Sequence, residues 1–352
     1  MGSGRRCFLS ILIVLCLIVD EPLLSFSSAT QDAFEIGRAE LATDETRILD
    51  TKDLPKGWAV ASDPDLVKFG QSWWMFFNSL QLDRTRNLPI HILSAHLPPG
   101  EGLDADPQHW IVSPYPVISP GPPGSWDDHT TETPKYVAGY DATDKQWVQR
   151  IYYVGWRIID RTKRIKDYRI GFVQWDGKRW KKHEGPILIG THEWERLKGY
   201  SFIGDQSLYY EPGQGPNGAQ GIWHMWYQTT SKASQGGPAL VHVTSADGVQ
   251  WGEKKRLSHV VPFANALTKT GPFHLDVFVK QGTFYFTGFL YNQKDLSRQG
   301  LWITSSRTPD GSEQGDFRVW LPLLYENNGT VWHDSGLISS KCHATGLFSA
   351  TL

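Results

Sequence analysis

Short apolar runs of strand type, separated by turn residues, recur along the chain from about residue 60 onward, and no segment shows a sustained helical period. The runs fall into four blocks with the same order. The first two blocks comprise residues 63–69, 72–79, 89–97 and 109–117, then 131–138, 150–157, 168–175 and 179–188. The last two comprise residues 204–211, 221–230, 238–245 and 250–257, then 274–281, 282–292, 300–307 and 317–324. This pattern predicts an all-β protein built from a repeated four-stranded unit.

A recurring turn supports this alignment of the blocks. In the last three blocks, the third and fourth runs are joined by an Asp-Gly pair, at residues 176–177, 247–248 and 310–311. Asp-Gly readily supplies the positive φ angles that a tight hairpin requires. Four-stranded antiparallel units repeated around an axis form a β-propeller, so this is the fold we expect.

The ends of the chain suggest how the ring closes. Residues 341–352 look like the first strand of a fifth block, and His343 lies 67 residues after Asp276. The sequence therefore predicts a five-bladed propeller over residues 61–352 whose fifth blade is incomplete. We expect residues 31–60, and in particular about 34–60, to close the ring beside the C-terminal strand.

The first thirty residues have the features of a secretory signal peptide. Arg5 and Arg6 precede an uncharged, largely apolar stretch over residues 7–19, and the small residues SFSSAT follow. The apolar stretch is shorter than the roughly 20 residues of a membrane-spanning helix. We expect this segment to be removed from a secreted or periplasmic protein, and an uncleaved anchor is the alternative.

Composition narrows the class of partner. Removal of the signal would leave Cys342 as the single cysteine, so the core must supply the stability without an internal disulfide. The 35 basic and 37 acidic residues nearly balance, which argues against nucleic acid and against a polybasic membrane contact. The expected partner is a carbohydrate, bound by a monomer.

Four acidic residues recur near the start of the first run of each block: Asp63, Glu132, Asp205 and Asp276. The intervals between them are 69, 73 and 71 residues. In a propeller the first strand of each blade lines the central channel, so these carboxyl groups should converge. Cleavage of a glycosidic bond needs one carboxyl group as a proton donor and another ionised as base or nucleophile.

Three of these acidic residues also have a plain structural explanation, and the fourth has alternatives nearby. Asp63 precedes Pro64 and could cap a turn, Asp205 could bond its own turn, and Asp276 could face an arginine or lysine in the channel. For Glu132, Asp127 or Asp128 in the polar lead SWDDHTTETP could be the working acid instead.

Residues 60–352 resemble the propeller glycoside hydrolases of families 43 and 32, which include arabinanases, arabinofuranosidases, xylosidases and fructan-cleaving enzymes. The resemblance rests on SDPDLVKFGQSWWMFF, TETPKYV, GDQSLYYE with GIWHMWYQTT, SADGVQW and CHATGLFS. It implies that Asp63 is the general base or nucleophile. It also implies an Asp in the second blade and a proton-donating Glu in the third, whereas this chain has Glu132 and Asp205.

This exchange leaves three possibilities for the acid. Glu132 has taken the role, Glu193 or Glu195 serves instead, or the activity has drifted. By the same resemblance His343 faces the channel near a possible structural calcium ion, although an ordinary core histidine is equally compatible with the sequence. No EF-hand spacing or Cys/His cluster occurs in the chain, and no cofactor is required.

Sugar rings also need a flat apolar partner. Trp126 is the first candidate, followed by Trp73 and Trp194, although core packing can account for any single tryptophan. The sequence thus predicts a glycoside hydrolase acting on a neutral glycoside or polysaccharide. A noncatalytic carbohydrate-binding propeller is the alternative, and a sialidase-like propeller is a third, because SADGVQW resembles the Asp-box of those enzymes with one residue fewer between Asp247 and Gly248.

Overall fold

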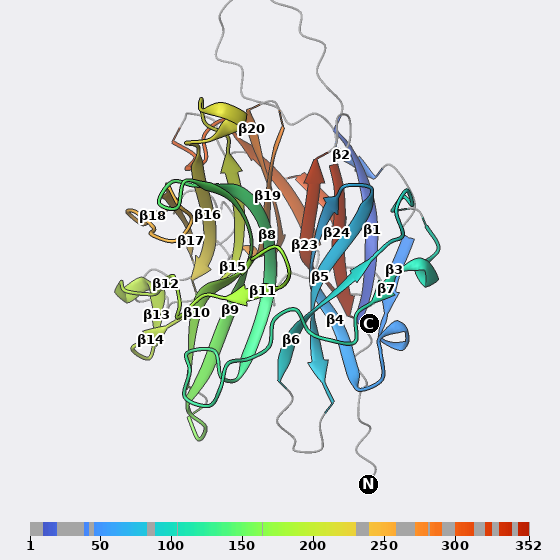
Figure 1. The fold of residues 1–352 in the computed structure, drawn as a ribbon, viewed down its shortest axis with the longest axis horizontal. Helices are drawn as coiled ribbons and strands as arrows, with labels where there is room; N and C mark the ends of the chain where they lie inside the picture. Colours follow the sequence, from blue (N-terminus) through green and yellow to red (C-terminus); the bar gives the residue numbers. More distant parts are fainter. Residues whose placement is uncertain are drawn as a thin grey trace, which may run out of the picture.

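Antiparallel strands account for most of the chain (Figure 1). The computed structural model describes residues 10–19, 39–41, 46–82, 89–103, 105–163, 165–229, 239–257, 272–280, 282–290, 300–312, 321–325, 331–339 and 344–351. Within these residues the only helical segments are single 3-10 turns: η1 (Thr51–Asp53), η2 (Pro107–His109), η3 (Glu193–Glu195) and η4 (Pro216–Gly218). None of them is long and apolar enough to cross a bilayer.

Four sheets each come from one continuous stretch of chain, as the repeat predicts. Blade 1 comprises β4 (Trp58–Phe69), β5 (Ser72–Gln81), β6 (Ile90–His96) and β7 (Ile111–Val112). Blade 2 comprises β8 (Thr130–Asp141), β9 (Gln146–Asp160), β10 (Ile165–Trp175), β11 (Trp180–Lys182) and β12 (Leu188–Ile189). Blade 3 comprises β15 (Ile203–Glu211), β16 (Ile222–Thr229), β17 (Ala239–Ser245) and β18 (Lys255–Arg256). Blade 4 comprises β19 (Pro272–Lys280), β20 (Thr283–Leu290), β21 (Gly300–Ser306) and β22 (Leu321–Tyr325), and a small ribbon of β13 (Arg196–Leu197) and β14 (Tyr200–Ser201) joins blades 2 and 3.

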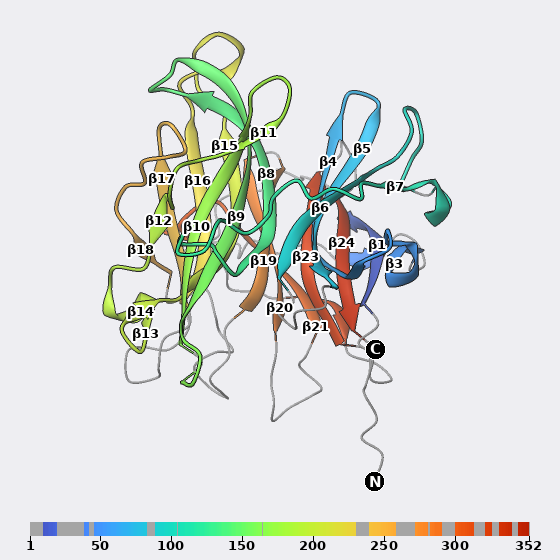
Figure 2. The same ribbon diagram turned by 60° about the horizontal axis from the view of Figure 1, so that its bottom comes forward.

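The innermost strands form a closed circuit. Strand β4 contacts β8, β8 contacts β15, and β15 contacts β19. The circuit is completed by β23 (Val331–Ser339), which contacts both β19 and β4. Figure 2 shows the sheets around this circuit. The propeller fold is therefore confirmed. Four blades are each continuous in sequence, where the sequence predicted five with the fifth incomplete or closed by the N-terminal segment.

The remaining sector is a composite sheet made from both ends of the chain. Strand β24 (Ala344–Thr351) lies between β23 and β1 (Ser10–Val19), and β1 also pairs with β2 (Ala39–Leu41) and β3 (Thr46–Asp50). Figures 1 and 2 show β1 beside β24. The innermost strand here is β23, so the expectation that the last residues of the chain form that strand is wrong: they supply the second strand.

The apolar stretch predicted to be part of a secretory signal forms β1 in this structure. Strands β2 and β3 do join the sheet that contains the C-terminal strand, but β1 separates them from β24. A run of ten residues with no charge satisfies the demands of a strand with neighbours on both edges as well as those of a signal sequence. Signal cleavage itself stays a prediction.

The predicted Asp-Gly turns are confirmed in the described residues. Gly177, Gly248 and Gly311 have φ angles of 93°, 71° and 64°, each between the third and fourth strands of its blade. Asp247 shows why the pair is favoured, because its Oδ1 accepts hydrogen bonds from the backbone N–H groups of Val249 and Gln250, both at 2.8 Å. The side chain thus replaces ladder bonds that the turn interrupts.

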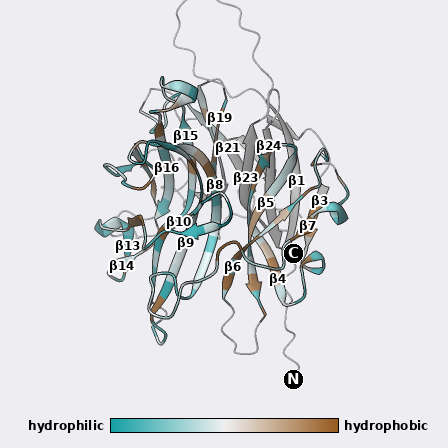
Figure 3. Ribbon diagram, in the orientation of Figure 1, coloured by the Kyte–Doolittle hydropathy of each residue, from teal (hydrophilic) through white to brown (hydrophobic). Residues whose placement is uncertain are grey.

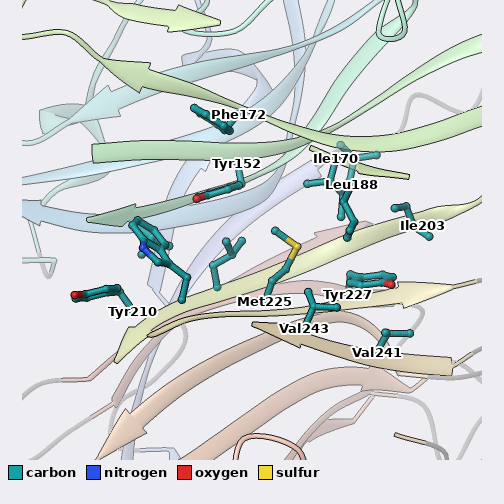
Figure 4. Packing of buried hydrophobic residues seen from close by; sticks show 14 of the residues in the cluster. Tyr152, Ile170, Phe172, Leu188, Ile203, Tyr210, Met225, Tyr227, Val241 and Val243 are labelled. Carbon is teal, nitrogen blue, oxygen red and sulfur yellow. The ribbon is translucent and has the colours of Figure 1, made fainter. Parts of the chain in front are cut away.

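Apolar residues gather along the strands and hydrophilic residues in the connecting loops (Figure 3). A hydrophobic core cluster lies between blades 2 and 3 and includes Tyr152, Trp223 and Met225, all fully buried. Figure 4 shows the packing of this cluster. Buried Arg150 lies between the rings of Phe172 and Trp223 in this interface. The aromatic side chains of this cluster therefore pack blades 2 and 3 against each other.

Candidate active site

Each of the first four innermost strands carries a β-bulge near its start. The pairing register shifts between Ser62 and Asp65 in β4, between Glu132 and Lys135 in β8, between Gly204 and Ser207 in β15, and between Phe273 and Asp276 in β19. Bulges redirect side chains and are enriched beside functional sites. In each pair, the residue directly after the first member belongs to what we call the bulge layer. The second member of each pair belongs to what we call the axial layer.

The bulge layer contains non-glycine residues with left-handed backbone conformation. Asp63, Thr133 and Asp205 occupy the same place in three blades, with φ angles of 48°, 52° and 48°. Such conformations cost of the order of 1 kcal/mol or more and persist where the surrounding structure imposes them. The repeated bulge therefore fixes the direction of two carboxyl groups, those of Asp63 and Asp205.

The four recurring acidic residues are not equivalent, which corrects the prediction from their spacing. Only Asp63 and Asp205 share a position. Glu132 lies one residue before the equivalent position, Thr133, and Asp276 lies in the axial layer at the position of Asp65. The sequence intervals are nearly constant because all four residues lie within three positions of the same bulge.

Hydrogen bonds link the bulges of blades 1, 2 and 3. The Asn78 side-chain amide donates to Asp63 Oδ2, and its oxygen accepts from the backbone N–H of Thr133 at 2.9 Å. The Gln206 side-chain amide then donates to the carbonyl of Thr133 at 2.6 Å. The carboxyl group of Asp63 is therefore oriented by a chain of polar contacts that crosses two blade boundaries.

The charges of Glu132 and Asp205 both affect the ionisation of one phenol, that of Tyr168. Tyr168 of β10 is largely buried, and burial raises the pKa of its hydroxyl, with the charges of Glu132 and Asp205 raising it further. Lys166 donates to the Tyr168 hydroxyl at 3.2 Å, and its Nζ lies 3.8 Å from the centroid of the Trp156 ring. Burial lowers the pKa of Lys166, while the charge of Glu132 opposes this shift. The second and third acidic residues thus share one electrostatic environment.

The axial layer is saturated with charge-compensating contacts. Lys135 Nζ lies 3.2 Å from Asp65 Oδ1 and 2.9 Å from Asp276 Oδ1, and all three side chains are buried. Ser207 donates to Asp276 Oδ1 at 2.8 Å, and the backbone N–H of Tyr136 donates to Asp65 Oδ2 at 2.6 Å. Asp276 therefore faces a lysine, as its structural explanation anticipated.

The ionisation of this layer follows from its burial. The pKa of Asp65 is raised to about 6 by the combined effect of its surroundings. Desolvation by burial is the largest cause and raises this pKa, Lys135 lowers it, and Asp276 raises it. The pKa of Lys135 is raised because the attraction of Asp276 and Asp65 exceeds the desolvation that lowers it. The described axial residues do not suit a bound calcium ion, because the ammonium group of Lys135 already lies between the two carboxyl groups.

Glu195 lacks the openness that a proton donor requires. It is fully buried, accepts hydrogen bonds from the Tyr227 hydroxyl at 2.6 Å and from Lys254 at 2.9 Å, and is also bonded by the backbone N–H groups of Thr191 and His192. These hydrogen bonds outweigh desolvation and lower its pKa. Glu193, in the same turn, is exposed.

The aromatic candidates lie in packing positions. Trp126 stacks on Tyr153 with 5.5 Å between ring centroids and covers Gly155 and Gly171, where a Cβ atom would lie 2.5 and 2.6 Å from its ring. The neighbouring Asp127 is buried and accepts from Lys182 at 2.7 Å and from the Tyr153 hydroxyl at 2.9 Å.

The other tryptophan candidates also lie away from the bulges. Trp73 pairs with Lys68 near the β4–β5 hairpin, and Trp194 stacks on His192 at 5.0 Å. Asp128, in contrast, is half-buried and lines a cavity between blades 1 and 2. His343 lies outside the described residues, so its predicted role was not examined by the structure.

Several polar residues of the site were missed from the sequence, among them Asn78, Tyr168 and Lys135. Asn78 and Tyr168 are ordinary strand residues there, and nothing in their spacing marks them. Lys135 had a signal: it follows Asp65 by 70 residues, one repeat length, within the quoted motif TETPKYV. Among the described residues, no group of three or more His, Cys, Asp or Glu is placed to hold a metal ion.

Comparison with known proteins supports the fold. No protein-family model and no curated protein sequence matches the chain. Among solved structures, it is similar to an exo-1,5-alpha-L-arabinanase from a bovine ruminal metagenomic library, with a TM-score of 0.52 and 12% identity over 85% of this chain and 94% of that one. A thermostable family-43 glycoside hydrolase is similar with a TM-score of 0.50 and 10% identity over 85% of this chain and 91% of that one. The chain has the propeller fold of these glycoside hydrolases.

Proposed function

We propose that the protein is a glycoside hydrolase whose reaction takes place at the bulge layer. The observation that carries this proposal is the placement of Asp63 and Asp205 at equivalent, left-handed positions, with Glu132 beside the third. In the axial layer next to them, Lys135 bridges the two buried carboxyl groups.

In the proposed reaction, Glu132 donates a proton to the oxygen of the scissile bond, and Asp63 acts as the base or nucleophile. As a base, Asp63 takes a proton from water while that water attacks the anomeric carbon. As a nucleophile, it forms a glycosyl ester that water then hydrolyses. Asp205 and the protonated Tyr168 hydroxyl orient the substrate and set the charge around Glu132. Both routes consume one water for each bond cleaved.

The sugar unit held at this layer is expected to be neutral, because three nearby carboxyl groups would repel an anionic one. Family 43 enzymes among the structural neighbours support a furanoside or pyranoside as the substrate class. We propose that the protein acts as a monomer and requires no cofactor.

The direct test is a screen of aryl furanosides and pyranosides, together with plant and algal polysaccharides, using wild type and Asp63→Asn. Wild type should release the aryl group or reducing sugar, and the variant should lose about 10²- to 10⁴-fold in rate. Asp144→Asn, at an exposed aspartate, is the matched control. Equal activity of wild type and Asp63→Asn would remove Asp63 from the mechanism. Sugar binding without turnover by wild type would favour the noncatalytic alternative.

We also propose that the protein is exported and that residues 1–30 are its signal peptide. Because residues 10–19 form β1 here, cleavage would remove one strand of the composite sheet. Residues 10–19 are either part of a cleaved signal or a strand of the propeller, and mass spectrometry of protein secreted by a eukaryotic or bacterial host distinguishes these two roles. A mature N-terminus near residue 30 supports a cleaved signal, whereas retention of residues 10–19 in the folded protein assigns them to the propeller.

A further inference from the structure

We propose that the cavity between blades 1 and 2 is an adjoining subsite that receives a carboxylate-bearing sugar residue of the substrate. This inference rests on the proposed hydrolase function and narrows its substrate class. The cavity has a volume of about 430 Å³, and its polar lining comprises Gln81, His91, Asp128, His129 and Arg161. Pro120, Pro123 and Ile158 supply an apolar wall.

The cavity adjoins the bulge layer. Gln81 lies three residues after Asn78 on β5, and His129 lies three residues before Glu132 on the lead into β8. Three extended residues span roughly 10 Å. A substrate bound at Asp63 and Glu132 therefore needs to extend only a short distance between blades 1 and 2 to reach the cavity.

His91 provides a buried polar group without a protein partner at one nitrogen. Its side chain is 8% exposed, and Nδ1 lies 3.1 Å from Ser119 Oγ. Within the described part of the chain, Nε2 has no hydrogen-bond partner. Burial, with a smaller effect of Lys182, lowers the pKa of His91 to about 4, so the imidazole is neutral at physiological pH. A neutral ring nitrogen suits a sugar hydroxyl, and its unsatisfied state has a cost that a ligand would relieve.

Arg161 supplies the charge selectivity. Its side chain is exposed, and the described residues place no carboxylate in an ion pair with it. Burial, followed by the charges of Lys166 and Arg161, lowers the pKa of His129, and the charge of Asp128 opposes this shift. Asp128 also accepts a hydrogen bond from the backbone N–H of Gly124 at 2.8 Å. The planar guanidinium group matches a carboxylate in bidentate geometry.

The two subsites thus differ in charge preference. The bulge layer holds carboxyl groups and favours a neutral sugar, whereas the cavity holds Arg161 and two histidines beside Asp128, and Arg161 favours a uronate. Such a pair would select a chain in which an acidic sugar lies next to the neutral unit that is cleaved.

The test uses ligand-observed NMR with glucuronate and galacturonate, and with glucose and galactose as uncharged counterparts. Wild type should bind the uronates more tightly, and Arg161→Gln should weaken uronate binding about tenfold while leaving the neutral sugars unchanged. Lys163→Gln, which removes an exposed cation of the same loop, is the matched control. His91→Gln should weaken all four ligands.

Two results would overturn the subsite: equal binding of uronates and neutral sugars by wild type, or an unchanged uronate preference in Arg161→Gln. The assay is independent of turnover, and Asp63→Asn should retain the preference. Hydrolysis without uronate selectivity would therefore refute the subsite alone. Uronate binding by a protein that hydrolyses no glycoside would refute the proposed hydrolase and leave the cavity as a binding site.

Discussion

The axial and bulge layers lie two residues apart on the same strands, yet they treat their carboxyl groups in opposite ways. In the axial layer, Asp65 and Asp276 are buried and held by Lys135. In the bulge layer, Asp63 and Asp205 are only half-buried and occupy left-handed backbone positions. An acidic residue near the propeller axis therefore need not belong to the proposed reaction site. The two layers differ in the burial of their side chains and in their backbone conformation.

Lys135→Met should have the largest effect, because it leaves two carboxylates buried without their counter-ion. We expect a loss of about 3–5 kcal/mol in the free energy of unfolding, measured by urea denaturation. Lys68→Met, at an exposed lysine beside Trp73, should change it by less than about 1 kcal/mol. Asp65→Asn added to Lys135→Met should recover part of the loss. Wild-type stability in Lys135→Met would mean that the axial layer is not held by charge.

Replacing the carboxyl group of Glu132 or of Asp205 with an amide should identify the proton donor. With Glu132 as the acid, Glu132→Gln should lose about 10²- to 10⁴-fold in kcat/KM on aryl glycosides with poor leaving groups. The loss should be much smaller with nitrophenolate leaving groups, which need little protonation. Asp205→Asn should slow all substrates alike. If the leaving-group dependence appears in Asp205→Asn instead, the acid role belongs to Asp205.

Asp65 should make stability depend on pH between its ordinary pKa of 3.8 and its folded pKa of about 6. In this window the folded protein holds the proton more tightly than the unfolded chain, so this contribution to stability is present at low pH and is lost as pH rises to about 6. The effect appears as the difference in unfolding free energy between wild type and Asp65→Asn at several pH values. A difference that grows with rising pH would reverse the assigned direction.

Glu195→Gln should cost about 1–3 kcal/mol in stability, because the partly buried Lys254 loses its charged partner. Its lowered pKa means that this contribution is present at neutral pH and is lost as pH falls through the folded pKa. Catalytic rates should not change. Glu193→Gln in the same turn should alter stability by less than about 0.5 kcal/mol, the smallest effect in this set. A large loss of activity in Glu195→Gln would return it to the candidates for the acid.

The blades could be predicted from sequence because their signals are local. Apolar runs and Asp-Gly turns depend on neighbouring residues, and both recur in register. The composite sheet was only partly predictable. Its strands come from residues at opposite ends of the chain, and the apolar stretch at residues 10–19 satisfies the pattern of a signal as well as that of a strand.

The site was less predictable because of the bulges. A bulge shifts the pairing by a residue without changing composition, so Glu132 and Asp276 looked equivalent to Asp63 when they are not. The neutralisation of Asp276 depends on Lys135, which lies in another blade. Asn78 and Tyr168 became part of the site only through pairing across strands. Such long-range contacts leave no periodic trace in a single sequence.

The pairing of β1 with β24 gives the ring a seam between residues that are made at opposite ends of synthesis. Contacts so distant in sequence are slow to form, because a long loop must be closed before they stabilise the chain. The four continuous blades can pair their own strands earlier. Until the seam forms, the edge of β24 presents unpaired backbone groups that can recruit another chain. Ring closure therefore depends on the pairing of β1, whose residues lie within the segment predicted to be a signal.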